Sequence, residues 1–410
     1  MLIIFGYFVF YEYTVISRNY SVGMMLIIIC CVLYRRRANH YFLFAVLLGV
    51  LANTHLFALL VSVAFFIALA VDYFFYQAPT QRQKRSVVFG TLLYAGCLLL
   101  GWIQMIPPTD SIAYTLLTGD FSGPRINNAL SILTQSFFPI PQWNTTGWWN
   151  TNFLVLHTPA SHNLIPILIL AIPFLIFARK PVAMIIFYFT AISTMLFIFF
   201  FWVGGVRYLG FVLISFIASL WVAEYYPSIP LVKMNKTFVA ISHILALVFI
   251  YVVLIIQVTA GGIAWAIDFE RPFSQSRNAA LYLADHHLTG DPVAVSSCDV
   301  GVPISGYLDQ KCFDAQINEW GSFCEWNLLS QVSNDTIFDR LKKFSKKQDR
   351  DVTVILNYPL FNVTSPAEND LVYEDSLLQV RFLKEFSGSN VKSENYFIYK
   401  IHSGRKEPQQ

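Results

Sequence analysis

Long apolar runs fill the first 258 residues of the chain, and the remaining residues lack them. A membrane-spanning helix needs about 20 mainly apolar residues to cross the roughly 30 Å hydrocarbon core of a bilayer. Runs near that length occur at about 17–34, 56–76, 87–107, 162–178, 182–203, 207–225 and 237–258. A polar turn at 53–55 sets off a further short span at 41–53, and the opening residues form another short span. The pattern therefore predicts about nine membrane-spanning helices.

Basic residues mark alternate junctions between the predicted spans. They are Arg35, Arg36, Arg37, Arg82, Lys84, Arg85, Arg179, Lys180, Lys233 and Lys236. Cytoplasmic loops of membrane proteins carry an excess of Lys and Arg, so these junctions indicate one orientation, in which all of them face the cytoplasm. The turn at 11–20 and the loop at 108–160 then lie outside. The sequence thus predicts a transmembrane body at 1–258 and an extracytoplasmic domain at 259–410.

The composition agrees with this division and excludes several classes of protein. Hydrophobic residues make up 56% of the chain and charged residues only 13%, whereas an ordinary soluble domain carries about 25% charged residues. A cytosolic enzyme, a nucleic-acid-binding protein and a disordered chain are therefore excluded. Residues 1–258 hold 13 Lys and Arg against 5 Asp and Glu, and 259–410 hold the remaining 15 against 20.

The C-terminal domain has the pattern of a small α/β fold. Residues 274–286 have helical character, and the segments typical of strands are 292–297, 352–356 and 396–401, the last as a candidate edge strand. The cysteines of this domain are Cys298, Cys312 and Cys324. In an oxidising compartment two of them would pair and one would stay free, and the sequence leaves the choice open.

Three arginines remain outside the cytoplasmic junctions, namely Arg18, Arg125 and Arg207. A guanidinium group is always charged, and its planar fork of donors matches phosphate oxygens. The alternative is that each arginine only extends its charged end to the membrane surface. Two glycines precede Arg207 and allow a ligand to approach closely, and Tyr208 follows it. We therefore expect a phosphate-binding site at the outer membrane surface.

The acidic residues on the same side are Glu12, Asp110 and Asp120. No acid of the membrane body falls at mid-membrane, where a proton- or sodium-coupled transporter usually places one. His55, in the turn at 53–55, is either a polar residue at a helix end or a donor to a phosphate. The histidines and cysteines lack the spacing of a metal site, so no cofactor is evident and a divalent metal has no support.

The loop at 108–160 is long for a connection, and loops of such length are usually functional or disordered. Its aromatic residues argue against disorder. Two of these, Trp148 and Trp149, allow two interpretations: an aromatic belt at the lipid interface, or a platform for sugar rings.

Several motifs together resemble a known family. They lie at residues 5–7, 11–20, 51–55, 204–208 and 320–323. With the many spans, the outward arginines, the aromatic outer loop and the C-terminal α/β domain, the chain resembles the C-type membrane glycosyltransferases, in their protein-mannosyltransferase-like bacterial branch. The resemblance implies transfer of a sugar from a polyprenyl-phosphate donor to a glycan, lipid or protein acceptor outside the membrane, usually with inversion.

The resemblance also implies roles for the candidate residues. The lipid phosphate would be held by Arg18, Arg207, Tyr208 and His55, and the sugar or acceptor would meet the loop that carries Arg125, Trp148 and Trp149. The family's catalytic acid sits in the first outer loop, which we expect upstream of Met1. Without it the chain would be inactive, and the remaining candidates for this role are Glu12, Asp110 and Asp120.

The start of the chain and the function class both have alternatives. The opening run barely reaches spanning length, so we expect a fragment that begins inside a helix, with a naturally short, tilted helix as the other interpretation. A lipid or polysaccharide transporter or flippase would show internal repeats and interrupted helices around a midplane site, and the sequence shows no internal repeat. A non-catalytic membrane scaffold with an external partner-binding domain is the third hypothesis.

Overall fold

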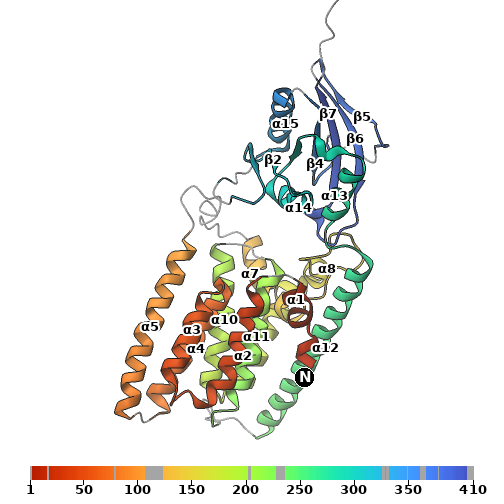
Figure 1. Ribbon diagram of the computed structural model, residues 1–410. Coiled ribbons are helices and arrows are strands. Elements are labelled where there is room, and N and C mark those ends of the chain that lie inside the picture. Colours follow the sequence, from red (N-terminus) through yellow and green to blue (C-terminus); the bar gives the residue numbers. More distant parts are fainter. Residues whose placement is uncertain are drawn as a thin grey trace, which may run out of the picture. The chain divides into compact units, whose positions relative to one another are not determined.

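The computed structural model describes residues 2–15, 18–77, 80–106, 123–201, 205–227, 236–325, 328, 332–348, 350–360, 366–376 and 378–403. The chain divides into two compact units (Figure 1). The first is helical and comprises Met1–Pro107, Leu116–Gln142 and Asn150–Trp265. The second holds the sheet and comprises Trp143–Trp149 and the described residues of Ala266–Gln410.

The first unit is built from helices, most of them apolar. Its longer helices are α2 (Tyr20–Leu33), α3 (Tyr41–Ala52), α4 (Leu56–Phe75), α5 (Gln81–Met105), α7 (Gly123–Phe137), α9 (Leu164–Phe177), α10 (Pro181–Phe200), α11 (Val206–Ala223) and α12 (Lys236–Glu270). The short elements are η1 (Leu2–Phe5), η2 (Tyr7–Glu12), α1 (Tyr13–Val15), η3 (Tyr34–Arg36), α8 (Phe153–His157) and η4 (Pro159–His162).

Among the described residues, five helices are long and apolar enough to cross a membrane, namely α4, α5, α10, α11 and α12. The apolar helices α3 and α9 are shorter, with 12 and 14 residues. A helix lies at each of the eight apolar runs that the sequence predicts after its opening residues. Two features were not predicted: α12 continues past residue 258 to Glu270, and α7 lies within the segment expected to be a loop.

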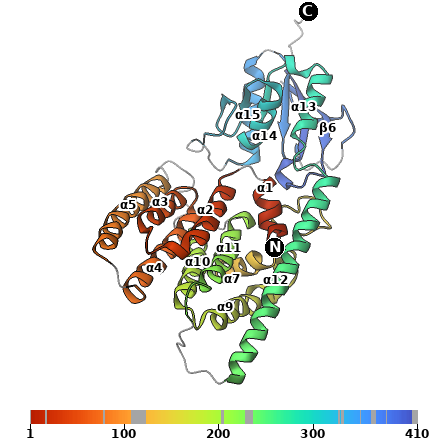
Figure 2. The ribbon, with the colours of Figure 1, turned by 60° about the horizontal axis from the view of Figure 1, so that its bottom comes forward.

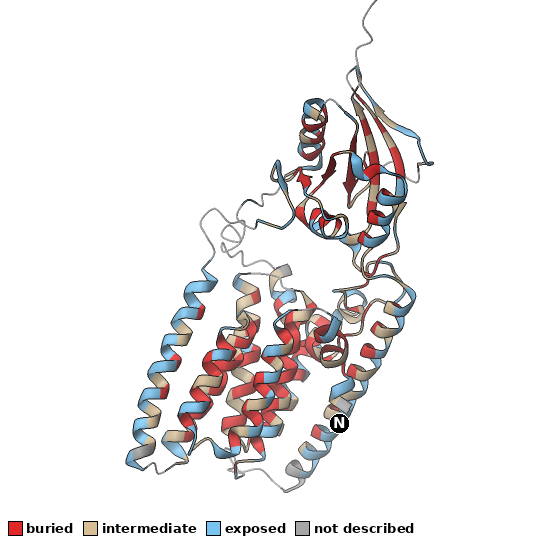
Figure 3. Ribbon diagram, in the orientation of Figure 1, coloured by how far each residue is buried: buried red, intermediate tan, exposed pale blue. Residues whose placement is uncertain are grey.

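Helix α11 lies in the middle of the helical unit and α5 at its rim (Figures 2 and 3). In the most apolar 18-residue stretch of each helix, 72% of the residues of α11 are buried, against 17% of those of α5. The exposed side chains of α5 include Leu92, Leu100 and Trp102. Water would penalise so large an apolar surface, whereas lipid tails do not. The unit is therefore a membrane-embedded bundle.

Small residues bring α3 and α5 together. A methyl group on Gly49 would lie 2.8 Å from Cys97 Sγ, and one on Gly90 would lie 3.1 Å from the Tyr41 ring. Close approach of backbones at small residues is the usual means by which membrane helices gain contact, because lipid removes the hydrophobic driving force between them.

A buried ion pair fastens one end of the bundle. Asp72, in the last turn of α4, is fully buried and accepts hydrogen bonds from Arg37 Nε at 2.8 Å and Nη2 at 2.7 Å. The Tyr226 hydroxyl donates to the same carboxylate at 2.6 Å, and the Tyr34 and Tyr226 hydroxyls lie 3.0 Å apart. The Arg37 guanidinium also lies over both rings. These contacts join the ends of α2, α4 and α11.

Other basic junctions lie at the same end. Lys180 Nζ, just before α10, donates to the carbonyl of Ala223 at 3.0 Å and so closes the last turn of α11. Gln83 Nε2, in the first turn of α5, donates to the carbonyl of Ala38 between α2 and α3. The described basic junctions therefore gather at one end of the unit, as the alternation along the sequence predicts.

The first residues are wound irregularly instead of forming one α-helix. A 3-10 turn, η1, is followed by the π-helix η2 and the short α1. Trp265 Nε1 in α12 donates to the carbonyl of Phe10 at 3.4 Å, and a methyl group on Gly261 would lie 3.0 Å from the carbonyl of Phe5. π-helical turns are rare and are frequently found at functional sites.

The described residues of the second unit form a seven-stranded mixed sheet in the order β3-β2-β1-β4-β7-β6-β5. The strands are β1 (Val293–Val295), β2 (Cys312–Asp314), β3 (Glu319–Gly321), β4 (Val352–Leu356), β5 (Leu371–Glu374), β6 (Leu378–Phe386) and β7 (Tyr396–Ser403). Strand β1 is parallel to β2 and β4, and the other pairs are antiparallel. Strand β7 lies between β4 and β6, so its assignment as an edge strand is wrong.

Helices cover both faces of this sheet because the strand side chains alternate. Val352 and Val354 of β4 pack in the core that contains α15 (Asn334–Gln348). Ile355, the residue after Val354, packs on the opposite face with α13 (Ser276–Asp285) and α14 (Cys298–Leu308). A strand buried on both faces is a nearly continuous apolar run, as β4 is apart from Thr353, and the second unit is an α/β domain.

The disulfide pairs Cys298 with Cys324, and Cys312 stays free and buried. The Ser305 hydroxyl donates to Cys312 Sγ at 3.3 Å. The prediction that two of the three cysteines pair is therefore confirmed, and the structure resolves the choice that the sequence left open. The bond joins the start of α14 to the segment that follows β3.

Candidate functional site

The predicted phosphate-binding residues lie where α2, α4 and α11 begin. Arg18 lies two residues before the start of α2 at Tyr20, His55 immediately precedes α4, and Arg207 and Tyr208 are in the first turn of α11. The same three helices end at the Asp72 ion pair. The site and the basic junctions therefore occupy opposite ends of the helical unit.

The start of α11 is fixed by Asn150. Its Oδ1 accepts a hydrogen bond from the backbone nitrogen of Val206 at 2.6 Å, which satisfies one of the free amides at the helix N-terminus. A methyl group on Gly205 would lie 2.6 Å from the same oxygen, so this contact requires glycine. The Tyr13 hydroxyl donates to the carbonyl of Arg207 at 3.1 Å. The backbone that carries Arg207 is thus held from two sides.

The Arg207 side chain is held against Tyr208. Its guanidinium carbon lies 4.9 Å from the centre of the Tyr208 ring, and Nη2 donates to the Tyr208 hydroxyl at 2.9 Å. A cation above an aromatic face is attracted by the ring quadrupole. The arginine is therefore oriented in advance, which reduces the entropy that it loses when it binds an anion.

His55 lies between these aromatic groups. Its ring is stacked on Tyr208, with centres 5.4 Å apart and planes 9° apart, and meets the edge of Tyr20 at 4.8 Å. Nδ1 accepts a hydrogen bond from the backbone nitrogen of Phe57 at 3.2 Å, so His55 caps the N-terminus of α4. In the neutral ring Nε2 then carries the proton and is a donor. The interpretation as a helix-end residue is confirmed, and the donor role is compatible with it.

Two arginines act on His55. Burial, then the charge of Arg207, then that of Arg18 lower the pKa of His55 to about 4. The ring is therefore neutral at physiological pH, and both predicted arginines lie close enough to influence it. Arg18 is exposed, and the side-chain amide of the next residue, Asn19, donates to the carbonyl of Thr54. The segment before α2 is thereby tied to the turn that holds His55.

The acidic candidates are placed unequally. Glu12, at the end of η2, is 1% exposed and accepts a hydrogen bond from the Tyr7 hydroxyl at 3.0 Å. Asp110 and Asp120 lie outside the described residues. A general base must reach the hydroxyl that it deprotonates, and the enclosure of Glu12 does not favour this role.

The predicted sugar-loop residues are divided between the two units. Arg125, in the first turns of α7, is half-buried and points Nη1 at the carbonyl of Phe199, 3.5 Å away. Trp148 belongs to the second unit and has no exposed surface, and the Trp149 ring packs against Phe273. A sugar platform needs an exposed ring face, so the structure favours a packing role for Trp148.

Packing also explains why residues 143–149 belong to the second unit. The backbone nitrogen of Gly147 donates to the carbonyl of Ser389, and that of Trp149 donates to the carbonyl of Asn390, each at 3.1 Å. Gly147 has φ +71° and a methyl group there would lie 2.8 Å from Lys392 Cβ, so only glycine fits this turn.

One group of residues in the described part of the chain has ligand atoms close enough for a metal ion. It consists of Cys298, Asp299 and Cys324, whose atoms lie within 4.8 Å of one another. Metals bind thiolates, and these two sulfurs are joined in the disulfide. The group therefore fits a metal only after reduction.

Sequence reasoning missed the partners of the arginines. Tyr13, Tyr20 and Asn150 hold Arg207 and His55 in place, and they come from segments far apart in the chain. A signal was present in the segment 11–20, which is unusually rich in tyrosine and charge for a membrane turn.

Comparisons of the chain with protein-family models, curated proteins and solved structures find no match.

Proposed function

We propose that this chain is the body of an integral membrane glycosyltransferase that uses a polyprenyl-phosphate-linked sugar as donor. The acceptor is a glycan, a lipid or a protein on the extracytoplasmic face. The observation that carries the proposal is Arg207 held on Tyr208, which is stacked on His55, at one end of a membrane-embedded bundle whose neighbouring segment carries Arg18. Guanidinium groups pair with phosphate through charge-assisted hydrogen bonds.

The proposed orientation follows from charge. About nine crossings, with the basic end of the bundle in the cytoplasm, obey the excess of Lys and Arg in cytoplasmic loops. The arginine site is at the opposite end of the same helices and so faces outward. The disulfide Cys298–Cys324 supports an extracytoplasmic second unit, because such bonds persist in oxidising compartments.

The proposed chemistry is displacement at the anomeric carbon. The acceptor oxygen forms a bond to this carbon, the bond to the phosphate oxygen breaks, and the lipid phosphate leaves with the electron pair. The negative charge that develops on the leaving oxygen is stabilised by Arg207 and Arg18, and His55 Nε2 and the Tyr208 hydroxyl offer neutral hydrogen-bond donors. The acceptor proton passes to a base that the described residues do not identify.

The proposal is tested by Arg207→Ala in the complete membrane protein. Transfer from a radiolabelled polyprenyl-phosphate hexose or pentose in proteoliposomes should fall by about 10²–10³, the usual cost of removing one donor to a developing negative charge. Cross-linking to a photoactivatable polyprenyl phosphate should fall as well, which gives a readout independent of turnover. The matched control is Arg35→Ala at the opposite end, which should change neither quantity. Normal transfer and cross-linking by a well-inserted Arg207→Ala protein would contradict the assignment.

A further inference from the structure

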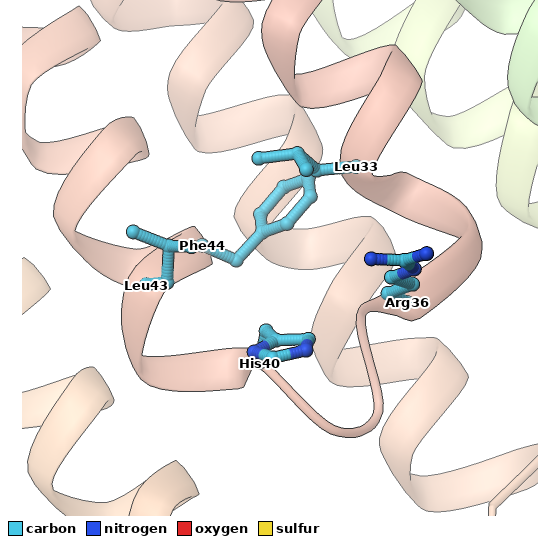
Figure 4. A pocket seen from close by; sticks show the side chains of 5 residues that line it. All are labelled: Leu33, Arg36, His40, Leu43 and Phe44. Atoms are coloured by element: carbon cyan, nitrogen blue, oxygen red, sulfur yellow. The ribbon is translucent and has the colours of Figure 1, made fainter.

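A small pocket lies at the basic end of the helical unit, where α2 passes through η3 into α3. It has a volume of about 150 Å³ and is lined by Leu33, Arg36, His40, Leu43 and Phe44 (Figure 4). In Figure 4 the Phe44 ring and Leu33 lie on one side of the space, and Arg36 and His40 lie on the other. The pocket thus combines an apolar wall with two nitrogen-bearing side chains, and its lining contains no carboxylate.

The charge of this pocket is not neutralised by the bundle. The neighbouring Arg37 is committed to the buried Asp72, whereas Arg36 and His40 are both exposed. Within the described part of the chain, no side-chain hydrogen bond or ion pair engages either of them. An arginine held beside an apolar wall without a protein anion is a site for an anion supplied from outside.

More positive charge lies next to the pocket. Gln83 Nε2 donates to the carbonyl of Ala38 and to Asn39 Oδ1, both at 3.3 Å, which places the start of α5 beside the turn that leads to His40. The next two residues of α5, Lys84 and Arg85, are exposed. Their field favours a negative headgroup over a zwitterionic one, whose ammonium they repel.

Exposed apolar side chains next to the pocket offer a surface for an acyl chain. Val32 and Phe42 flank the pocket along the chain and are 54% and 47% exposed, and Leu43 is 46% exposed. These side chains belong to membrane-embedded helices and so face lipid. A cavity of about 150 Å³ holds a molecule the size of benzene. It therefore admits a headgroup phosphate with its adjoining carbons, and the rest of the lipid lies along the exposed apolar surface.

We infer that this pocket binds an anionic phospholipid, with the phosphate at Arg36 and His40 and an acyl chain along the outer faces of α2 and α3. Basic pockets between membrane helices on the cytoplasmic side are known to take anionic headgroups. This site is separate from the arginine site at the other end of the bundle and does not depend on the proposed glycosyltransferase function.

The inference is tested by native mass spectrometry of the whole protein in detergent, with phosphatidylglycerol and phosphatidylcholine of matched chains as probes. The wild type should retain phosphatidylglycerol in preference. Arg36→Gln should weaken this binding about fivefold, the effect of one basic residue near a membrane surface. The matched control is Arg35→Gln, which removes the same charge from the adjacent exposed position outside the pocket and should change the binding by less than half as much on a logarithmic scale.

Three outcomes would overturn the inference. Equal losses in Arg35→Gln and Arg36→Gln would show diffuse attraction without a site. Equal retention of the two lipids by the wild type would show that the pocket does not select charge. Displacement of the lipid by inorganic phosphate alone would show a site for the phosphate ion and not for a lipid. Circular dichroism of each variant confirms that the fold is retained, as expected for exposed side chains.

Discussion

The ion pair at the basic end of the bundle should be a main determinant of its stability. Asp72 has no exposed side-chain surface, and Arg37 is 14% exposed. In Asp72→Asn one oxygen still accepts from Arg37 or Tyr226, but the negative charge is lost and an amide replaces the other oxygen. Breaking a buried ion pair by removing one partner costs about 3–5 kcal/mol, and we expect this decrease in the free energy of unfolding.

The two partners should not be equivalent. Arg37→Gln leaves a carboxylate with no access to water, whereas Asp72→Asn leaves a guanidinium that still reaches solvent through its exposed part. We therefore expect Arg37→Gln to cost more than Asp72→Asn. Tyr226→Phe removes the hydrogen bond to the carboxylate together with the one between the Tyr226 and Tyr34 hydroxyls. The bond to the charged group alone should contribute about 1.5–3 kcal/mol. The double variant Arg37→Gln/Asp72→Asn should cost clearly less than the sum of the two single changes, because it leaves no unpaired charge.

Reversible unfolding in mixed micelles of dodecylmaltoside and sodium dodecyl sulfate, followed by circular dichroism, measures these differences. The buried packing residue Ile186, changed to Val, provides a control whose expected cost is about 0.5–1.5 kcal/mol and which has no electrostatic component. The reasoning fails if Asp72→Asn lies within about 0.5 kcal/mol of the wild type, or if the costs of the single changes simply add.

Two further predictions concern the second unit. Replacing Cys298 and Cys324 by Ser removes a bond between residues 26 apart. Because the unfolded chain then gains the entropy of an open loop, the free energy of unfolding should fall by about 3.5 kcal/mol. Pulse proteolysis in urea measures this, and an unchanged unfolding midpoint would contradict it. Burial raises the pKa of Asp314, so the folded state binds this proton more tightly than the unfolded state, and the resulting stability is present at low pH and is lost as the pH rises through the raised pKa. The free energy of unfolding of Asp314→Asn relative to the wild type should therefore increase as the pH rises above about 4, the ordinary value for Asp, and level off above the raised pKa. A difference that is independent of pH would refute the burial argument.

The candidate site was predicted in part. Charge counting and the paired glycines singled out Arg18, Arg207 and Tyr208, and the polar turn singled out His55. The structure places all four at the starts of three neighbouring helices. The sequence did not predict that Asn150 fixes α11, since the two residues that form this hydrogen bond are 56 positions apart. Composition alone also did not reveal that Trp148 is completely enclosed.

Helix α7 and the strand hairpin β5–β6 were missed for a local reason. Polar residues are frequent in α7, so a search for apolar runs passes over it, although the proline in its first turn is a helix-start signal. In β6 buried and partly exposed residues alternate over much of the strand, which is a weaker signal than the almost entirely apolar sequence of β4. The error at β7 has another origin, because a strand's neighbours are set by the topology and not by its own sequence.

The sequence by itself determined where the apolar helices lie, where the basic junctions lie, and that a small α/β domain follows. These properties depend on runs of neighbouring residues and on their length against the thickness of a bilayer. Only the tertiary structure decided which residues meet: Arg207 with Tyr208 and His55 at one end, Arg37 with Asp72 at the other, and Cys298 with Cys324 in the second unit. Such pairings depend on how helices and strands far apart in the chain pack together, and no local pattern of residues specifies that packing.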